Sequence, residues 1–233
     1  MQGFKLKLLT GLALLAMIWI GPASAQHVGR TVKATQRLAA VLGVHEVFAK
    51  PAQASQHLGV VQSRRPLTGE RTVLPVVGAI AGWLHVRLPG RPNGHTGWIR
   101  SEATAPRVTP WHLLVDTSTR RVTVYDRGRA LRVFKGIVGK PSTPTPHGEF
   151  FVEESIRLGP TDVGAPFALA LSARSTVFQS FDGGPGQIAL HGLDNVGGIL
   201  GTAASHGCVR LADSAMRWLV GRIGPGVPVT ITG

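Results

Sequence analysis

Residues 188–211 have the sequence IALHGLDNVGGILGTAASHGCVRL, which contains Cys208, the only cysteine of the chain. Two histidines, His191 and His206, and Arg210 lie in the same stretch. A thiol is a poor nucleophile at neutral pH because little of it is thiolate, so a reactive cysteine needs a nearby imidazole or positive charge. The stretch therefore predicts cysteine chemistry with Cys208 as the nucleophile.

The two histidines differ in how they can reach the sulfur of Cys208. Side chains two residues apart on an extended strand point to the same face, so His206 can lie beside Cys208, but each stays on its own Cα. His191 arrives from another segment and can approach the sulfur directly. We therefore predict His191 as the base.

Other groups of the same stretch can bind a substrate. Glycines at 192, 197, 198, 201 and 207 allow the backbone to run close to a ligand. The amides of Gly207 and Cys208 are candidate oxyanion donors. The planar guanidinium of Arg210 suits either a substrate carboxylate or a salt bridge within the domain, and both alternatives stay open.

Two other interpretations of Cys208 were weighed against catalysis. His191, His206 and Cys208 form a possible three-ligand zinc set. The nearby carboxylates of Asp194 and Asp213 have no recognised metal spacing, so we expect no metal. A buried, inert thiol is the second alternative, since free cysteine is often buried. The histidines around Cys208 favour catalysis over both.

The N-terminus predicts export. Basic residues precede an uncharged apolar run at 8–20, and small residues follow at 23–25. This order is typical of a secretory signal peptide at 1–25, and the run is short for a membrane span. We expect the mature chain to begin at Gln26, without a transmembrane anchor, in the periplasm or cell wall. An uncleaved membrane anchor is the alternative.

The chain is strongly basic, with a formal net charge of +13, of which +11 remains once Lys5 and Lys7 are removed. Such a charge favours polyanionic surroundings, and an exported chain meets anionic cell-wall polymers and lipid headgroups. The basic residues are scattered and lack interleaved aromatics, so we expect no nucleic-acid partner. A generally basic, solvated surface is the simpler interpretation.

Residues 41–105 contain short apolar runs separated by turn residues, which predicts a small β-barrel after a linker at 26–40. Two Gly-Trp steps, at Trp83 and Trp98, flank residues 89–94, which we expect to connect a hairpin. This stretch resembles a bacterial Src-homology-3-like (SH3-like) domain, and the resemblance implies docking to the cell wall or packing against a catalytic partner. The two tryptophans are either a recognition surface or barrel core.

Residues 110–233 predict a second domain, mainly β, beyond a Pro-containing join at 105–110. Strand-like runs separated by turns occur at 113–115, 122–125 and 131–138, and the chain ends on a strand at 227–231. Asp213 is expected to cap a helix. The apolar positions of that helix have helical spacing: Ala215, Met216, Leu219, Val220 and Ile223.

Two motifs carry a resemblance to a known family. The first is SHGCVR at 205–210 together with His191-Gly192, and the second is VGKPSTPTPHGEF at 138–150. Both are similar to the signature of the L,D-transpeptidase family with its YkuD-type catalytic domain. The resemblance covers nearly all of residues 111–233. It departs at Leu193, where the family commonly has Thr or Ser.

The resemblance implies a β-sandwich domain that acts on peptidoglycan stem peptides without a metal or organic cofactor. In the family's reaction, Cys208 would attack the carbonyl between meso-diaminopimelate and the terminal D-alanine of a tetrapeptide stem. The thioester would then pass its acyl group to an amine on another stem or on a protein, or to water. His191 would accept and then donate the proton.

The resemblance also implies supporting roles around the reacting groups. Ser205 and His206 would shape the pocket, a backbone carbonyl near Gly192 would orient the base, and Arg210 would support the substrate or the loop. Three functions therefore stay open: a transpeptidase in cell-wall crosslinking or protein attachment, an L,D-carboxypeptidase, and a noncatalytic cell-wall binding protein. The presence of Cys208 with both histidines favours an enzyme.

Overall fold

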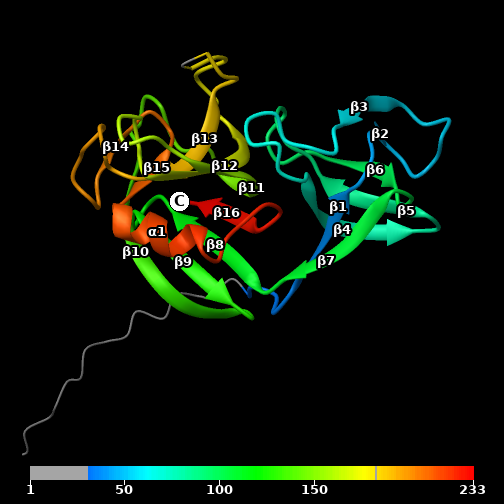
Figure 1. Ribbon diagram of the computed structural model, residues 1–233, viewed down its shortest axis with the longest axis horizontal. Helices are drawn as coiled ribbons and strands as arrows, with labels where there is room; N and C mark the ends of the chain where they lie inside the picture. Colours follow the sequence, from blue (N-terminus) through cyan, green and yellow to red (C-terminus); the bar gives the residue numbers. More distant parts are fainter. Residues whose placement is uncertain (1–30, 182) are drawn as a thin grey trace, which may run out of the picture. The chain divides into compact units, whose positions relative to one another are not determined.

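The computed structural model describes residues 31–181 and 183–233, and the N-terminal part of this described region forms a seven-stranded antiparallel sheet (Figure 1). Its strands are β1 (Gln36–Val41), β2 (His45–Phe48), β3 (His57–Val61), β4 (Val73–Ile80), β5 (Trp83–Arg87), β6 (Thr96–Arg100) and β7 (Thr104–Thr109). They lie in the order β3-β2-β6-β5-β4-β1-β7. The turn-punctuated apolar runs of the sequence are the alternating strands of this sheet.

The first and last strands of the N-terminal sheet differ from the sequence prediction. Residues 36–40 were expected in a linker, but they belong to β1, which pairs with β4 on one side and β7 on the other. Residues 105–109 were expected in a join, but they belong to β7 and pair along β1. Both expectations were wrong because these short strands contain few large apolar residues, and the backbone pairing that makes them strands leaves no pattern in the sequence.

The expected hairpin around residues 89–94 is confirmed. β5 and β6 pair antiparallel from Trp83 with Arg100 to Arg87 with Thr96, and the loop between them connects their ends. Trp83 is buried and meets Phe48 edge-on, with ring centroids 5.5 Å apart, so it is a core residue.

Trp98 of the same hairpin is half-buried and stacks on His85, with ring centroids 4.6 Å apart. It is therefore accessible in part. The SH3-like nature of the N-terminal sheet stays a prediction.

The C-terminal half of the described chain contains nine further strands that form a sandwich. They are β8 (Trp111–Asp116), β9 (Arg121–Asp126), β10 (Arg129–Gly139), β11 (Gly148–Arg157), β12 (Phe167–Arg174), β13 (Gln187–His191), β14 (Ala203–Ser205), β15 (Val209–Leu211) and β16 (Pro228–Thr232). β10 pairs first with β9 and then with β15, and β11 pairs first with β16 and then with β12. These two long strands link the layers, so the predicted mainly β fold is confirmed.

The helix of the C-terminal half, α1 (Asp213–Val220), packs on the sandwich core (Figure 1). Ala215, Met216 and Leu219 are buried, as their helical spacing predicted. The expectation that Asp213 caps this helix was wrong, because Ala212 occupies the N-cap position without a side-chain hydrogen bond. The Asp213 carboxylate instead accepts a hydrogen bond of 2.7 Å from the backbone amide of Leu193.

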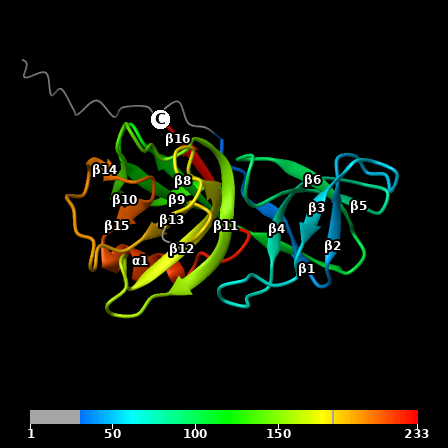
Figure 2. The same cartoon turned by 90° about the horizontal axis from the view of Figure 1, so that it is seen from above.

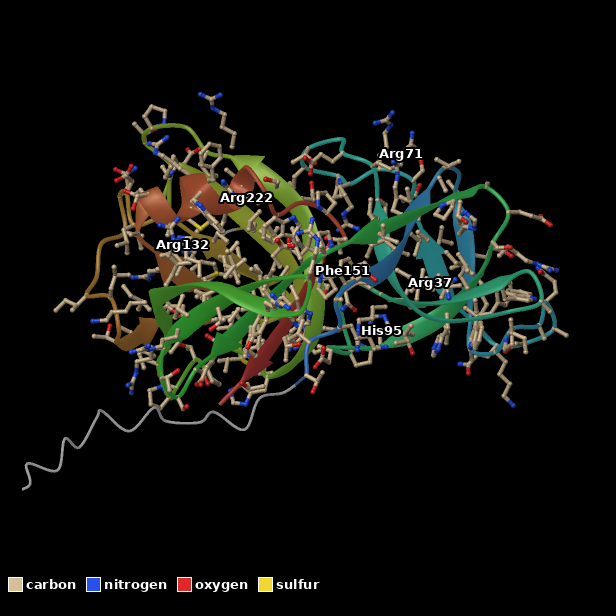
Figure 3. The ribbon with its side chains drawn as sticks, turned by 90° about the horizontal axis from the view of Figure 1, so that it is seen from below. Arg37, Arg71, His95, Arg132, Phe151 and Arg222 are labelled. Atoms are coloured by element: carbon tan, nitrogen blue, oxygen red, sulfur yellow. The ribbon has the colours of Figure 1, made fainter. Side chains whose placement is uncertain are left out.

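β11 contributes to two hydrophobic cores. Phe150 lies in the core of the C-terminal sandwich, and Phe151 lies in the core of the N-terminal sheet with Val41, Leu74 and Ile99. Successive side chains of a strand point to opposite faces, so one strand can serve both cores. Figure 2 shows β11 beside β4, and Figure 3 labels Phe151 between the two groups of strands.

A buried ion cluster joins the two parts of the unit Val32–Gly233 next to Phe151. Glu153 of β11 forms ion pairs with Arg174 of β12, at 2.9 Å, and with Arg65 of the loop between β3 and β4. Burial lowers the pKa of Arg174 to about 10. Beside this cluster, Glu154 accepts hydrogen bonds of 2.9 Å from the backbone amide and the hydroxyl of Thr68.

The predicted signal peptide at 1–25 lies outside the described residues. Within residues 31–181 and 183–233, no helix is long and apolar enough to cross a membrane.

We expect Glu153→Gln to lower the free energy of unfolding by about 3 kcal/mol, because it leaves the buried charge of Arg174 without its carboxylate partner, while Arg65 keeps only Glu154, at 3.7 Å. Urea denaturation followed by far-UV circular dichroism measures this loss. The matched control is Asp126→Asn, which removes the exposed pair with Arg127 and should cost less than about 1 kcal/mol. Equal losses in the two variants would contradict the role of the cluster.

Candidate active site

β13 and β15 lie side by side as parallel neighbours and bring the predicted site together (Figure 1). In their register, Leu190 lies opposite Val209, and His191 lies opposite Arg210. Leu190 and Val209 are fully buried, so strand alternation places His191 and Arg210 on the other face. Cys208 precedes Val209 and shares that face. Two segments separated in sequence thus present their polar groups to one side.

These groups line a cavity of about 240 Å³. Cys208, His191, Arg210, Ser205 and His206 all border it. The rest of the lining is largely apolar and includes Val163, Phe178, Phe181, Ile188 and Val196. The sequence predicted the polar side of this pocket but not its apolar side, because most of the apolar residues lie in loops without a periodic pattern and only Ile188 lies in a strand, β13.

The ring of His191 is held by a single backbone carbonyl. Its Nδ1 lies 2.9 Å from the carbonyl oxygen of Gly192. A carbonyl can only accept a hydrogen bond, so Nδ1 carries the hydrogen and the neutral ring presents Nε2 as its acceptor. Gly164 lies against the same ring, and a Cβ at that position would collide with Nδ1.

Burial also sets the charge of His191. It lowers the pKa of the imidazole, opposed by the hydrogen bond to Gly192 and assisted by the positive charge of Arg210. The ring is therefore neutral at neutral pH.

The thiol of Cys208 is also neutral at rest. Burial raises its pKa, while a hydrogen bond with the Ala189 backbone and the charge of Arg210 act in the opposite direction. Burial thus favours the neutral thiol of Cys208 and the neutral imidazole of His191.

The backbone around Cys208 is shaped by Ser205, whose side chain is fully buried. Its hydroxyl donates to the carbonyl of Cys208 at 2.6 Å and accepts from the amide of Gly207 at 3.1 Å. Gly207 has φ of +123°, a conformation that favours glycine. An oxyanion at the Gly207 amide would have to displace the Ser205 hydroxyl, so this amide is engaged at rest.

The motif at 138–150 supports the same loop from behind. Thr143 donates its hydroxyl to the carbonyl of Ser205 at 3.1 Å, and Thr145 donates to the carbonyl of Gly207 at 2.8 Å. Thr145 also accepts from the amide of Gly139 at 2.9 Å. Sequence analysis identified the motif but not these roles. Both threonines are buried, so their hydroxyls fix the loop's conformation.

Arg210 has unused hydrogen-bonding capacity. It donates to the carbonyl of Gly197 at 3.3 Å, and its Nε is buried without a hydrogen-bond partner. Among the ion pairs of residues 31–181 and 183–233, none joins Arg210 to a carboxylate. The salt bridge that the sequence left open is therefore not formed within the described residues.

His206 is exposed and contacts aromatic rings. Its ring centroid lies 6.1 Å from those of Phe178 and Phe181. No group of three His, Cys, Asp or Glu side chains in the described part of the chain could hold a metal. Gly192, the other expected pocket residue, lies behind the pocket, where a Cβ would collide with the carbonyl of Ala165.

Comparison with known proteins identifies the family of this chain. The model of the L,D-transpeptidase catalytic domain, YkuD, matches residues 110–231, which is more than half of the chain. The chain therefore belongs to the YkuD family of L,D-transpeptidase catalytic domains.

Individual relatives are more distant. L,D-transpeptidase 1 of Mycobacterium tuberculosis is 24% identical over 226 residues, covering 72% of this chain and 87% of the relative. A putative L,D-transpeptidase YkuD of Bacillus subtilis is 29% identical over 129 residues, covering 54% of this chain and 68% of the relative. A crystal structure of an L,D-transpeptidase from M. tuberculosis has 17% identity and a TM-score of 0.47, covering 83% of this chain and 81% of that chain. This structural likeness is too low to add to the assignment.

The neutral resting state of Cys208 predicts how its alkylation depends on pH. Because burial raises the pKa of the thiol, we expect the alkylation rate with iodoacetamide to reach half its maximum above pH 8.5, about the pKa of an ordinary cysteine. Intact-mass spectrometry measures the rate, and the single cysteine makes every adduct report on Cys208. A rate already at its plateau at pH 7 would instead indicate a preformed thiolate–imidazolium pair.

Proposed function

We propose that this chain is a peptidoglycan L,D-transpeptidase with Cys208 as nucleophile and His191 as base. The observation that carries the proposal is the convergence of Cys208, His191 and Arg210 on one pocket, in a chain of the L,D-transpeptidase family. Its substrate would be the tetrapeptide stem of peptidoglycan, and its acceptor an amine on another stem or on a protein. No cofactor takes part in the proposed reaction.

The first half-reaction forms a thioester. The sulfur of Cys208 attacks the carbonyl that joins meso-diaminopimelate to D-alanine, while Nε2 of His191 takes the thiol proton. His191 then gives this proton to the departing amine of D-alanine. The hydrogen bond from Nδ1 to Gly192 supports this assignment, because it leaves Nε2 as the basic atom.

The developing oxyanion needs hydrogen-bond donors. We assign this role first to the amide of Cys208. The amide of Gly207 can join it only if the Ser205 hydroxyl moves away. Removing one such donor in other enzymes lowers the rate by about 100-fold to 1,000-fold. Release of the Gly207 amide from the Ser205 hydroxyl would therefore affect the rate of the proposed reaction.

The second half-reaction transfers the acyl group. An acceptor amine attacks the thioester, His191 removes its proton, and the proton returns to the departing sulfur. Attack by water would make the same protein an L,D-carboxypeptidase. The largely apolar lining of the pocket supports transfer over hydrolysis, because apolar side chains exclude water from a reactive intermediate.

The proposed place of action is the periplasm or the cell wall, which the predicted signal peptide supports. The positive net charge of the chain suits a surface of anionic cell-wall polymers. In this proposal the N-terminal sheet either docks on the wall or packs against the catalytic part. The buried ion cluster around Glu153 supports the second role.

The test is to incubate disaccharide-tetrapeptides with the chain from Gln26 onward and with its Cys208→Ala variant. We expect the unchanged chain to release D-alanine and form crosslinked dimers, and the variant to form neither. Mass spectrometry separates the products. Tripeptide without dimer would identify a carboxypeptidase, and no product from the unchanged chain would contradict the enzyme proposal.

A second pair of variants tests the base. His191→Ala should lower the rate by about 100-fold to 10,000-fold, the usual contribution of general acid–base catalysis. His57→Ala is the matched control, because this exposed histidine of β3 is not part of the pocket lining. A similar rate in the two variants would remove His191 from the mechanism.

Arg210 is proposed to bind a carboxylate of the donor stem. Replacing it by Gln should raise KM for the donor about tenfold to 100-fold, since hydrogen bonds to charged groups contribute about 1.5–3 kcal/mol. Steady-state kinetics with a donor and its amidated form provide the measurement. The amidated donor should lose little on Arg210→Gln, and equal losses for both donors would assign Arg210 to the loop instead.

A further inference from the structure

The two aromatic side chains on the apolar side of the pocket come from one loop between β12 and β13, residues 175–181 and 183–186, here called the wall segment. Its Phe178 and Phe181 line the pocket of Cys208, with ring centroids 5.6 Å apart. Both rings also contact His206. The position of this segment therefore sets the shape of the pocket opposite the reacting groups.

The wall segment is closed on itself at its base. The amide of Ser175 donates to the carbonyl of Gly186 at 2.7 Å, and the Ser175 hydroxyl accepts from the amide of Phe178 at 3.0 Å. Its far end is solvent-exposed, since Phe181 is 54% exposed. Within the segment, Phe181 and Gly184 also exchange two backbone hydrogen bonds of 2.9 Å, and an external contact can hold the whole segment against the pocket.

Arg91 supplies that contact from the N-terminal sheet. Its guanidinium donates to three backbone carbonyls of the described wall segment: Ser175 at 2.9 Å, Phe178 at 2.8 Å and Pro185 at 3.0 Å. These carbonyls come from both ends of the segment. The planar guanidinium can bridge them because it presents five donors in a fixed geometry.

The loop that carries Arg91 is itself aligned along β12. The side chain of Asn93 donates to the carbonyl of Arg174 at 2.7 Å and accepts from its amide at 2.8 Å. The amide of Gly90 donates to the carbonyl of Ser172 at 3.2 Å. These contacts fix the backbone on both sides of Arg91, so its guanidinium is held where the wall segment begins and ends.

We propose that Arg91 is a positioning residue that holds the wall segment, with Phe178 and Phe181, in the substrate-binding position. The proposal rests on the proposed function of the same pocket. Through Arg91, the N-terminal sheet would then contribute to substrate affinity as well as to any docking role.

The contacts also predict which kinetic constant depends on Arg91. A wall segment that is in place for only a fraction of the time lowers the apparent affinity for the donor by that fraction. Cys208 and His191 are held by β13 and β15, and Arg91 makes no hydrogen bond to either of these strands within the described residues. Loss of Arg91 should therefore raise KM and leave kcat nearly unchanged.

The experiment compares Arg91→Ala with Arg64→Ala in the chain from Gln26 onward. Arg64 is the matched control, because it belongs to the N-terminal part and donates to the carbonyl of Gly69, at 2.8 Å, within its own loop. For Arg91→Ala we expect faster amide hydrogen exchange in peptides covering 176–186, and KM for the donor raised about tenfold with kcat within about twofold. Arg64→Ala should change neither, and Arg91→Lys should restore part of the affinity.

Equal exchange of the wall segment in Arg91→Ala and Arg64→Ala would overturn the proposal. A fall in kcat at constant KM would overturn it as well. If the unchanged chain releases no D-alanine from the stem, the proposed function fails, and hydrogen exchange alone then decides the positioning role. In that case faster exchange only in Arg91→Ala supports it, and unchanged exchange refutes it.

Discussion

The parallel pairing of β13 with β15 sets the positions of Cys208, His191 and Arg210. Opposing His191 to Arg210 places Leu190 and Val209 in the core and leaves the polar side chains on the pocket face. A shift of one residue in either strand would turn its polar side chain into the core, because strand side chains alternate between faces. The hydrophobic core therefore enforces the register of the site, and the threonines at 143 and 145 fix the loop that leads into β15.

A second constraint joins the two parts of the molecule. β11 places Phe151 in the N-terminal core and then carries Glu153, whose two arginine partners are Arg65 of the β3–β4 loop and Arg174 of β12. Hydrophobic packing excludes water around these charges. A buried charge without an oppositely charged partner is unfavourable, so each charge depends on its partner. This docking brings the loop of Arg91 to the end of β12, so substrate affinity in the proposed reaction becomes linked to the stability of the junction.

Sequence patterns predicted the elements that have a clear local pattern. They failed where contacts with other parts of the chain determine the structure. The strands at 113–115, 122–125, 131–138 and 227–231 were predicted correctly, because turn residues separate their short apolar runs. The strand at 36–41 was taken as linker up to residue 40, because this stretch is polar and Ala-rich with little periodicity, and only its pairing with β4 and β7 makes it a strand. The carboxylate of Asp213 was expected to cap its helix, but a backbone amide at residue 193 competes for it.

The sequence of residues 188–211 alone identifies Cys208 and the two nearby histidines, and it indicates the family of the chain. These features are local, because a cysteine needs its activating groups whatever the fold around them. The protonation states of Cys208 and His191 depend instead on burial, which changes a pKa only after distant strands have excluded water. The contact of Arg91 with the wall segment likewise depends on docking between segments about 90 residues apart, which no local pattern encodes.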